Sequence, residues 1–242
     1  MTEPAAADRP GPVVFLDRDG TLNRDIGYLR DPDQLELLPG VGAALRALRA
    51  ADARIVIVTN QSGVARGALT EARLELVHQR LRRLLEAEGA SVDGIFYCPH
   101  HPDDRCRCRK PGTELIERAR TQLALEPAPS YVVGDKLADV QLAHRIGANS
   151  VLVRTGHGEH VLKSWPDGEQ PPDHVANDLA AAVQWILGQR RSGPGAARGA
   201  GASSPHGKSW GTQAIDAVPI SHGPPHRMTG AAGLMSEGEA EQ

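Results

Sequence analysis

The sequence predicts an α/β protein built on a doubly wound parallel sheet. Short apolar runs rich in β-branched residues recur along the chain, and amphipathic helical patterns lie between them. Continuously apolar strands of this kind are buried on both faces, which is typical of a parallel sheet covered by helices on each side. With roughly 150 residues per domain as a guide, 242 residues predict one domain with some chain left over.

Five segments have the length and β-branched enrichment of buried strands. They are Val13–Leu16, Arg54–Val58, Gly94–Tyr97, Tyr131–Val133 and Ser150–Val153.

Four apolar stripes at helical spacing separate these strands. They run through Val41–Leu48, Leu74–Leu85, Leu115–Leu123 and Val140–His144. Thr70 is a suitable N-cap for the second helix, and Gly147 is a suitable stop for the fourth. Residues 10–188 are therefore expected to fold as one domain. Residues 189–242 are crowded with Gly, Ala, Ser and Pro and are expected to form a disordered tail.

Composition excludes several classes of function. A net charge of −3 and eight aromatic residues argue against a nucleic-acid-binding protein. No apolar run approaches the roughly 18 residues of a membrane span, and the N-terminus lacks the pattern of an export signal, so we expect a cytoplasmic protein. All three cysteines lie between positions 98 and 108, which favours a local metal site in a reducing compartment over a disulfide framework.

Polar clusters follow three of the predicted strands. They are Asp17–Thr21, Thr59–Gly63 and Gly134–Asp139. Because ligands bind at the carboxyl ends of parallel strands, we expect these clusters to meet at one edge of the sheet.

The first and third clusters are rich in carboxylates. Asp17 and Asp19 point the same way if strand geometry continues past Leu16, and two adjacent carboxylates stay ionised together when a cation lies between them. Oxygen ligands suit Mg²⁺, with Asp135 as a third donor. The alternative is that Asp17 and Asp19 only cap a turn or helix.

A carboxylate that faces a metal-bound phosphate can attack phosphorus and form an aspartyl-phosphate. A second carboxylate can protonate the departing oxygen and later activate water. The hydroxyl of Thr59, the amides around Asn60 and the ammonium group of Lys110 are suitable partners for the phosphoryl oxygens.

These motifs resemble the haloacid dehalogenase superfamily of phosphatases. The resemblance rests on Val14–Asn23, Thr59–Asn60, Lys110–Pro111 and Gly134–Asp139, in that order, and spans about residues 12–158. The cysteine-rich loop narrows it to a zinc-containing group that comprises the heptose 1,7-bisphosphate 7-phosphatases and the histidinol-phosphate phosphatases.

The cysteine-rich loop supplies three thiolates and an imidazole, a complete tetrahedral set for a structural zinc ion. The ligands would be Cys98, His100, Cys106 and Cys108. His101 is an alternative to His100, although the family pattern favours His100. The other interpretation is three free cysteines beside an unrelated histidine.

The resemblance also implies a role for each active-site residue. Asp17 would be the nucleophile and Asp19 the acid and base, while Thr59 and Lys110 would hold the phosphoryl group. Mg²⁺ would be held by the side chains of Asp17 and Asp135 and by the backbone carbonyl of Asp19. Substrate contacts would come from Asp25, Ile26, Gly27, Tyr28, Thr59, Asn60, Gln61, Ser62, Arg66, Arg109, Lys110 and Lys136.

Two segments favour a heptose substrate over histidinol phosphate. Asp25–Leu29 resembles the substrate loop of heptose phosphatases, and Thr59–Gly67 includes Arg66, which can meet a second phosphate. The short spacing from His100 to Cys106 is also typical of histidinol phosphatases. A non-catalytic, zinc-stabilised binding module is the alternative from another class. The core has no room for a lid domain, so the fold is expected to be capless, its partner a small sugar bisphosphate and the protein a monomer.

Overall fold

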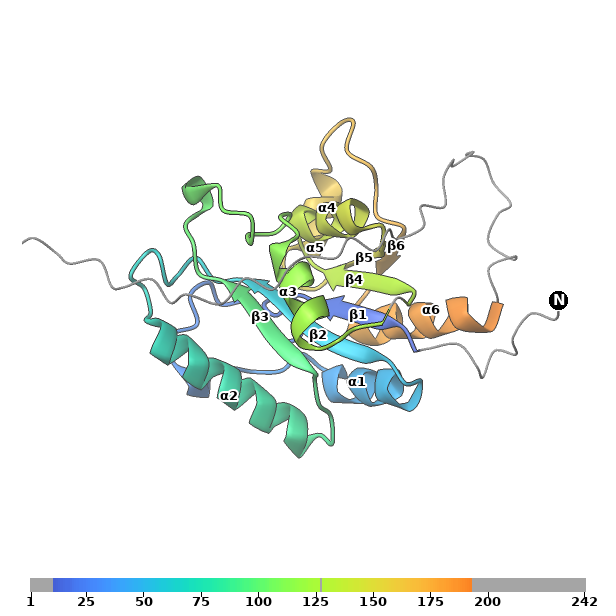
Figure 1. Ribbon diagram of the computed structural model, residues 1–242, viewed down its shortest axis with the longest axis horizontal. Coiled ribbons are helices and arrows are strands. Elements are labelled where there is room, and N and C mark those ends of the chain that lie inside the picture. Colours follow the sequence, from blue (N-terminus) through green and yellow to red (C-terminus); the bar gives the residue numbers. More distant parts are fainter. Residues whose placement is uncertain (1–10, 127, 193–242) are drawn as a thin grey trace, which may run out of the picture. The chain divides into compact units, whose positions relative to one another are not determined.

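The computed structural model describes residues 11–126 and 128–192. Its elements in chain order are β1 (Val13–Leu16), η2 (Pro32–Gln34), α1 (Val41–Ala50), β2 (Arg54–Asn60), α2 (Glu71–Ala87), β3 (Gly94–Cys98), η3 (Pro102–Asp104), α3 (Glu114–Gln122), β4 (Ser130–Gly134), α4 (Leu137–Ile146), β5 (Asn149–Val153), α5 (Gly158–Lys163), β6 (His174–Ala176) and α6 (Leu179–Ser192) (Figure 1). Within these residues, no helix combines the length and apolar character needed to cross a bilayer.

The strands form one parallel sheet in the order β3-β2-β1-β4-β5-β6. In the centre of the sheet, Phe15 of β1 lies opposite Val56 of β2 and Val132 of β4. The chain leaves β1 toward one edge of the sheet and later returns to β4 on its other side. The carboxyl ends of β1 and β4 therefore flank the switch point at which open α/β sheets bind ligands.

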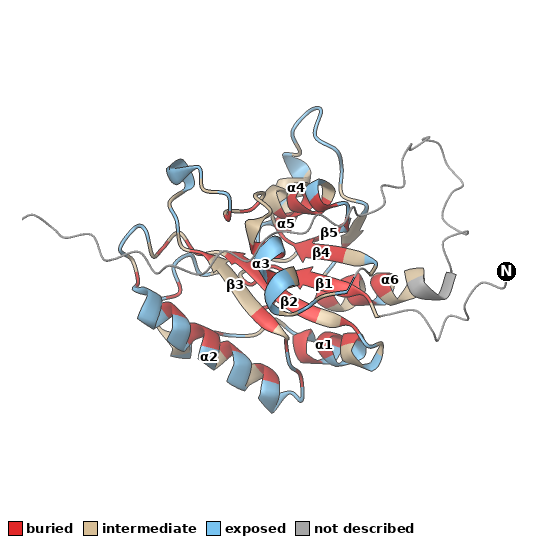
Figure 2. Cartoon of the chain, viewed as in Figure 1, coloured by how far each residue is buried: buried red, intermediate tan, exposed pale blue. Residues whose placement is uncertain are grey.

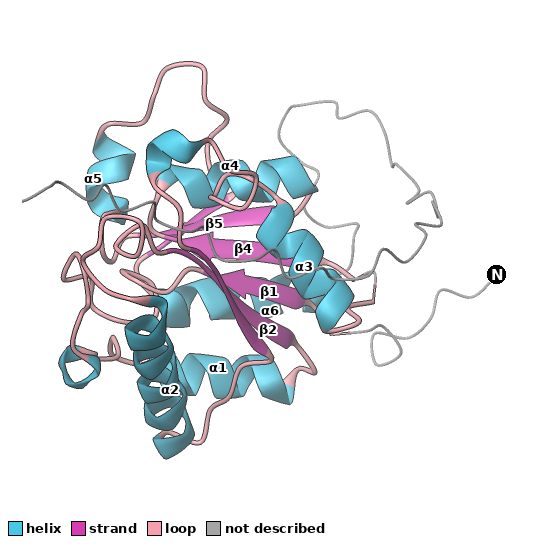
Figure 3. Cartoon of the chain, turned by 60° about the vertical axis from the view of Figure 1, so that its left-hand side comes forward, coloured by secondary structure: helices cyan, strands magenta, loops and turns pink. Residues whose placement is uncertain are grey.

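Helices cover both faces of the sheet (Figure 3). Because strand side chains alternate in direction, Val14 and Leu16 pack into the core with α1, α2 and α6, whereas Val13 and Phe15 pack into the core with α3 and α4. The inner strands β1, β2, β4 and β5 are mostly buried, whereas most residues of the edge strands β3 and β6 are only half-buried (Figure 2). This arrangement confirms the predicted doubly wound parallel sheet.

The predicted N-cap and the predicted helix stop are also confirmed. The Thr70 side chain accepts a hydrogen bond from the Arg73 amide at the start of α2, and Gly147 ends α4 in the left-handed conformation. Between β1 and α3, the described chain contains only α1, β2, α2, β3 and two short 3₁₀ turns, and no cap domain is inserted.

The C-terminal part of the sheet extends beyond the prediction. Strand β6 was not anticipated, because three residues are too short to form a recognisable apolar run. Helix α6 continues to Ser192, four residues beyond the boundary expected at residue 188. The remaining tail, 193–242, lies outside the described residues.

Candidate active site

Lys110 is the centre of the polar cluster at the carboxyl edge of the sheet. Its Nζ lies 2.8 Å from Oδ1 of Asp17 and 2.6 Å from Oδ1 of Asp139, and it donates a hydrogen bond of 2.9 Å to the carbonyl of Val58. The side chain is almost completely buried. Burial alone would lower the pKa of Lys110, but the charges of Asp139 and Asp17 outweigh it and raise that pKa. The ammonium group is therefore a permanent cation beside Asp17.

The loop that carries Lys110 is held by Asn60 at the end of β2. The Lys110 amide donates to Oδ1 of Asn60 at 2.9 Å, and Nδ2 of Asn60 donates to the Lys110 carbonyl at 3.2 Å. The Asn60 side chain thus uses its amide to fix the backbone of Lys110. Nearby, Thr59 Oγ1 accepts a hydrogen bond of 2.9 Å from Gln61.

Three buried carboxylates meet beside Lys110. Asp17, Asp135 and Asp139 each offer one oxygen, and these oxygens lie within 4.8 Å of one another. Burial first, and the charge of Asp17 next, raise the pKa of Asp135 to about 7. Lys136 opposes this effect from 3.6 Å away. The cluster holds more negative charge than its lysines neutralise, so its donor set fits a divalent cation with oxygen ligands.

The surroundings of Asp135 support that fit. Its Oδ1 is buried without a hydrogen-bond partner, while its Oδ2 accepts a hydrogen bond of 2.7 Å from the His157 amide. A Cβ atom at either Gly20 or Gly156 would lie 2.2 Å from Oδ2. Glycine at both positions therefore leaves space around this carboxylate that any other residue would fill.

Asp19 has different partners from Asp17. Its carboxylate forms an ion pair of 2.8 Å with Arg18 and accepts hydrogen bonds from Asn23 and Gln61. Burial would raise the pKa of Asp19, but the Arg18 charge and these hydrogen bonds lower it. β1 ends at Leu16, so the two aspartates do not continue its strand. Each is paired with its own basic side chain.

A second polar group lines the site between Asp25 and the turn after β5. Lys136 Nζ lies 3.3 Å from Oδ2 of Asp25, and His157 Nε2 lies 3.2 Å from the same oxygen. The turn closes on the first loop, because Thr155 Oγ1 donates to the Gly20 carbonyl at 2.6 Å. The loop residues Ile26 and Tyr28 are exposed large hydrophobic side chains, and their predicted contact with substrate stays a prediction.

The predicted substrate residues differ in how close they lie to this cluster. Arg109 precedes Lys110 and has a buried Nη1 without a hydrogen-bond partner. Ser62 accepts a backbone hydrogen bond from Arg66, whose side chain is exposed on the loop after β2. The predicted role of Arg66 stays a prediction.

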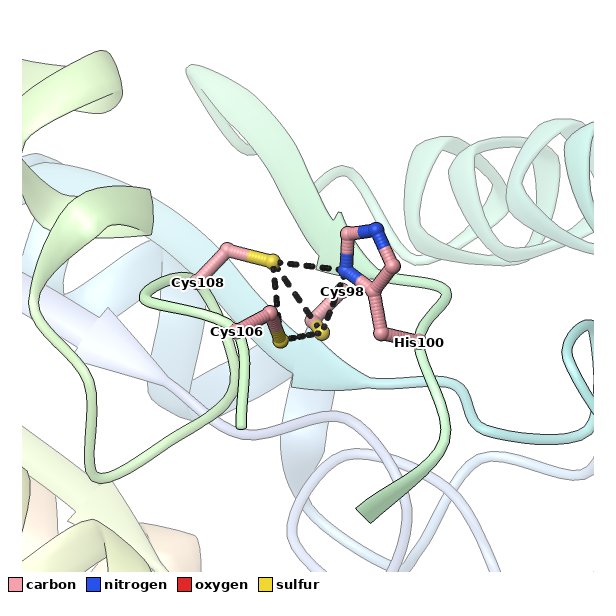
Figure 4. Close-up of side chains that lie close together, drawn as sticks. All are labelled: Cys98, His100, Cys106 and Cys108. Carbon is pink, nitrogen blue, oxygen red and sulfur yellow. Dashed lines mark hydrogen bonds between the residues drawn. The ribbon is translucent and has the colours of Figure 1, made fainter. Parts of the chain in front are cut away.

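The four predicted zinc ligands lie close together (Figure 4). The three sulfurs of Cys98, Cys106 and Cys108 are separated by 3.2–3.5 Å, and His100 Nδ1 lies 3.1 Å from Cys108 and 3.5 Å from Cys98. These S–S separations exceed the roughly 2.05 Å of a disulfide and approach the roughly 3.7 Å between sulfurs of a tetrahedral zinc site. The four side chains therefore fit zinc.

His101 takes another role. It caps η3, where its ring accepts a hydrogen bond from the Asp103 amide, and it does not belong to the cysteine cluster. This geometry selects His100 over His101.

The sequence prediction gave no role to three residues that the structure brings to the site. Asp139 belongs to the third strand-end cluster, four residues after Asp135, and that clustering was a usable signal. Arg18 lies between the two aspartates, but buried arginines have no distinctive sequence pattern. His78 comes from α2 and contacts Arg18.

Comparison with known proteins agrees with this geometry. The profile of HAD-hydrolase-like proteins matches residues 107–182. The chain is 42% identical over 190 residues to the D-glycero-beta-D-manno-heptose-1,7-bisphosphate 7-phosphatase of Escherichia coli K12, covering 74% of this chain and 96% of that protein. It is 39% identical over 188 residues to the D-glycero-D-manno-heptose-1,7-bisphosphate 7-phosphatase of Thermosynechococcus vestitus, covering 73% and 96%.

Solved structures show the same relationship. The D,D-heptose 1,7-bisphosphate phosphatase of B. bronchiseptica, in complex with magnesium and phosphate, superposes with a TM-score of 0.67 at 38% identity, covering 73% of this chain and 98% of that one. The enzyme from Burkholderia thailandensis has a TM-score of 0.57 at 31% identity, covering 73% and 99%. Fold and site are thus those of haloacid dehalogenase-like hydrolases. Within that class, the chain belongs to the family of D-glycero-D-manno-heptose-1,7-bisphosphate 7-phosphatases, which confirms the resemblance seen in its motifs.

Proposed function

We propose that this protein hydrolyses the 7-phosphate of D-glycero-D-manno-heptose 1,7-bisphosphate and releases heptose 1-phosphate and inorganic phosphate. The observation that carries the proposal is the convergence of Asp17, Lys110 and Asp135 at the switch point of the sheet in a chain of this family. A buried carboxylate next to a permanent cation is suited to attack a bound phosphoryl group.

The reaction proceeds in two displacements. An oxygen of Asp17 bonds to phosphorus as the bond from phosphorus to O7 breaks. Asp19, which must first bind a proton because its contacts with Arg18 lower its pKa, transfers that proton to O7. Water then bonds to phosphorus as the bond from phosphorus to Asp17 breaks, and Asp19 takes the proton from that water. Thr59 and Lys110 hold the phosphoryl oxygens throughout.

The carboxylate cluster would hold Mg²⁺ through Asp17, Asp135 and the backbone carbonyl of Asp19. When bound, the ion would neutralise these carboxylates and the phosphoryl oxygens. The zinc ion would have a structural role, because all four of its ligands come from the protein. By holding the loop that precedes Lys110, it would link metal retention to activity.

The remaining substrate residues surround this centre. Asp25 and Lys136 contact each other beside the cluster, and Arg109 is adjacent to Lys110 in the chain. These residues, with the segments at 25–28 and 60–62 and with Arg66, would bind the sugar and its distal phosphate. We also infer that the protein acts as a cytoplasmic monomer, which mass determination in solution tests.

The decisive experiment measures phosphate release from both heptose anomers and from histidinol phosphate. The heptose bisphosphate should have the highest kcat/KM, because specificity is a ratio of those values. A preference for histidinol phosphate would replace the substrate assignment. No release from any substrate, with Mg²⁺ present and zinc bound, would favour a binding module. Asp17→Asn should retain the fold and lose turnover.

A further inference from the structure

Arg18 lies between Asp17 and Asp19, and its side chain is only 1% exposed. A buried guanidinium group is costly unless its N–H groups find acceptors. Three of the hydrogen bonds of Arg18 go to its neighbour Asp19: Nε to Oδ1 at 3.1 Å, Nη2 to Oδ1 at 3.0 Å and Nη2 to Oδ2 at 2.8 Å. A planar group that contacts both oxygens determines the plane of the carboxylate as well as its position.

The other side of the guanidinium group rests on His78 of α2. Arg18 Nη1 lies 3.3 Å from His78 Nε2. Since arginine can only donate, Nε2 must accept, and the imidazole is neutral. Burial, and next the charge of Arg18, lower the pKa of His78 to about 3, in agreement with that state. His78 also contacts the ring of Tyr97 in β3, with centroids 5.5 Å apart. Arg18 therefore contacts α2 through His78, and His78 in turn contacts β3.

Two amides complete the environment of the Asp19 carboxylate. Gln61 Nε2 donates to Oδ2 at 2.8 Å, and Asn23 Nδ2 donates to Oδ1 at 3.0 Å. Arg18 is the one partner with contacts to both oxygens in this group. Lys110, in contrast, contacts Asp17. Arg18 thus pairs with Asp19, and Lys110 pairs with Asp17.

We propose that Arg18, supported by His78, is a positioning residue that orients the Asp19 carboxyl group toward the leaving oxygen of the substrate. This inference rests on the proposed function, in which Asp19 transfers its proton to O7 as the bond from phosphorus to O7 breaks. Misplacement of that carboxyl group should slow the departure of an alkoxide, which needs the proton. It should have little effect on the departure of 4-nitrophenolate, which leaves as a stable anion.

The test compares kcat/KM for heptose bisphosphate and for 4-nitrophenyl phosphate, since kcat/KM reports the steps up to the first displacement. Asp19→Asn is the reference variant. Its kcat/KM should fall about 10²–10⁴-fold for the heptose bisphosphate and far less for 4-nitrophenyl phosphate. Arg18→Lys keeps the charge but not the planar contact with both oxygens. It should show the same selective loss, of about 10²-fold on the sugar. Combined with Asp19→Asn, it should add no further loss, because both changes act on one group.

Variants of His78 test the support from α2 without changing the loop of the two aspartates. His78→Leu removes the acceptor and should give a smaller loss of the same substrate-selective kind. His78→Gln restores an acceptor and should recover most of the activity on the sugar. Gln79→Leu, at the exposed neighbouring position, is the matched control. It should leave kcat/KM unchanged for both substrates.

Equal losses on both substrates in Arg18→Lys and His78→Leu, with the wild-type fold retained by circular dichroism, would overturn the inference. If Arg18→Lys does not fold, the His78 pair decides, and equal rates for His78→Leu and wild type would reject it. A loss in Asp19→Asn that does not depend on the leaving group would instead remove the acid role of Asp19 itself, which is a failure of the proposed function.

Discussion

Lys110 and Asp139 form an ion pair of 2.6 Å between two side chains that are almost completely buried. Asp139 lies in the first turn of α4, where its other oxygen accepts a hydrogen bond of 3.1 Å from the Lys136 amide. A Cβ atom at residue 134 would lie 2.2 Å from that carboxylate, so the approach requires Gly134 at the end of β4. The pair joins the loop after the zinc cluster to the strand ends that carry Asp17 and Asp135.

Lys110→Met should destabilise the protein and abolish turnover. The change leaves Asp17 and Asp139 buried without their shared cation, and breaking a buried pair costs about 3–5 kcal/mol. Urea denaturation without Mg²⁺ measures the loss. The control is Lys163→Met, because Lys163 pairs with Glu159 on the surface and such pairs contribute little. An unchanged free energy of unfolding in Lys110→Met would contradict the central role of this lysine.

Mg²⁺ should stabilise the wild-type protein through Asp135. A ligand that binds only the folded state adds about 2.7 kcal/mol at 100 times its Kd. The rise in Tm with Mg²⁺ should disappear in Asp135→Asn and persist in Glu159→Gln, a surface control. A rise of wild-type size in Asp135→Asn would place the ion elsewhere.

Zinc content should distinguish the two adjacent histidines. His100→Ala removes one of four ligands and should lower the zinc content and Tm of the purified protein. His101→Ala changes a cap of η3 and should retain zinc at the wild-type level. Elemental analysis of both variants decides the matter, and zinc loss confined to His101→Ala would reverse the ligand assignment.

Asp93, which lies at the amino ends of the strands, should make the free energy of unfolding depend on pH. Its carboxylate accepts a hydrogen bond of 2.6 Å from the Ile55 amide and pairs with Arg49 and Arg54. Burial would raise the pKa of Asp93, but these partners outweigh it and lower that pKa below 3.8. Its contribution is therefore complete above pH 3.8 and lost as the pH falls through the folded-state pKa.

Asp93→Asn should consequently lower the free energy of unfolding at pH 7 by about 1–3 kcal/mol. The difference from wild type should shrink in acid, while activity at pH 7 stays unchanged. Glu36→Gln, which alters the exposed pair with Arg24, is the control and should have little effect. If the difference in the free energy of unfolding between wild type and Asp93→Asn grew as the pH fell, the predicted direction of the pKa shift would be wrong.

Local pattern was sufficient for much of the fold. The five longer strands were recognisable as apolar runs, and the helices between them as stripes with a cap at Thr70 and a stop at Gly147. The three-residue β6 carries too few apolar positions to be seen in this way.

By itself, the sequence determined which chemistry collects at the carboxyl edge, because in a parallel sheet every polar cluster that follows a strand meets there. It also determined that the three cysteines and a neighbouring histidine form one local cluster, since these donors lie within eleven residues, whereas the structure chose His100 over His101. Only the tertiary structure decided which basic group each carboxylate pairs with. Arg18 meets His78 across 60 residues, and Asn60 holds Lys110 across 50. Such contacts depend on side-chain orientation in the packed core, and no spacing along the chain encodes it.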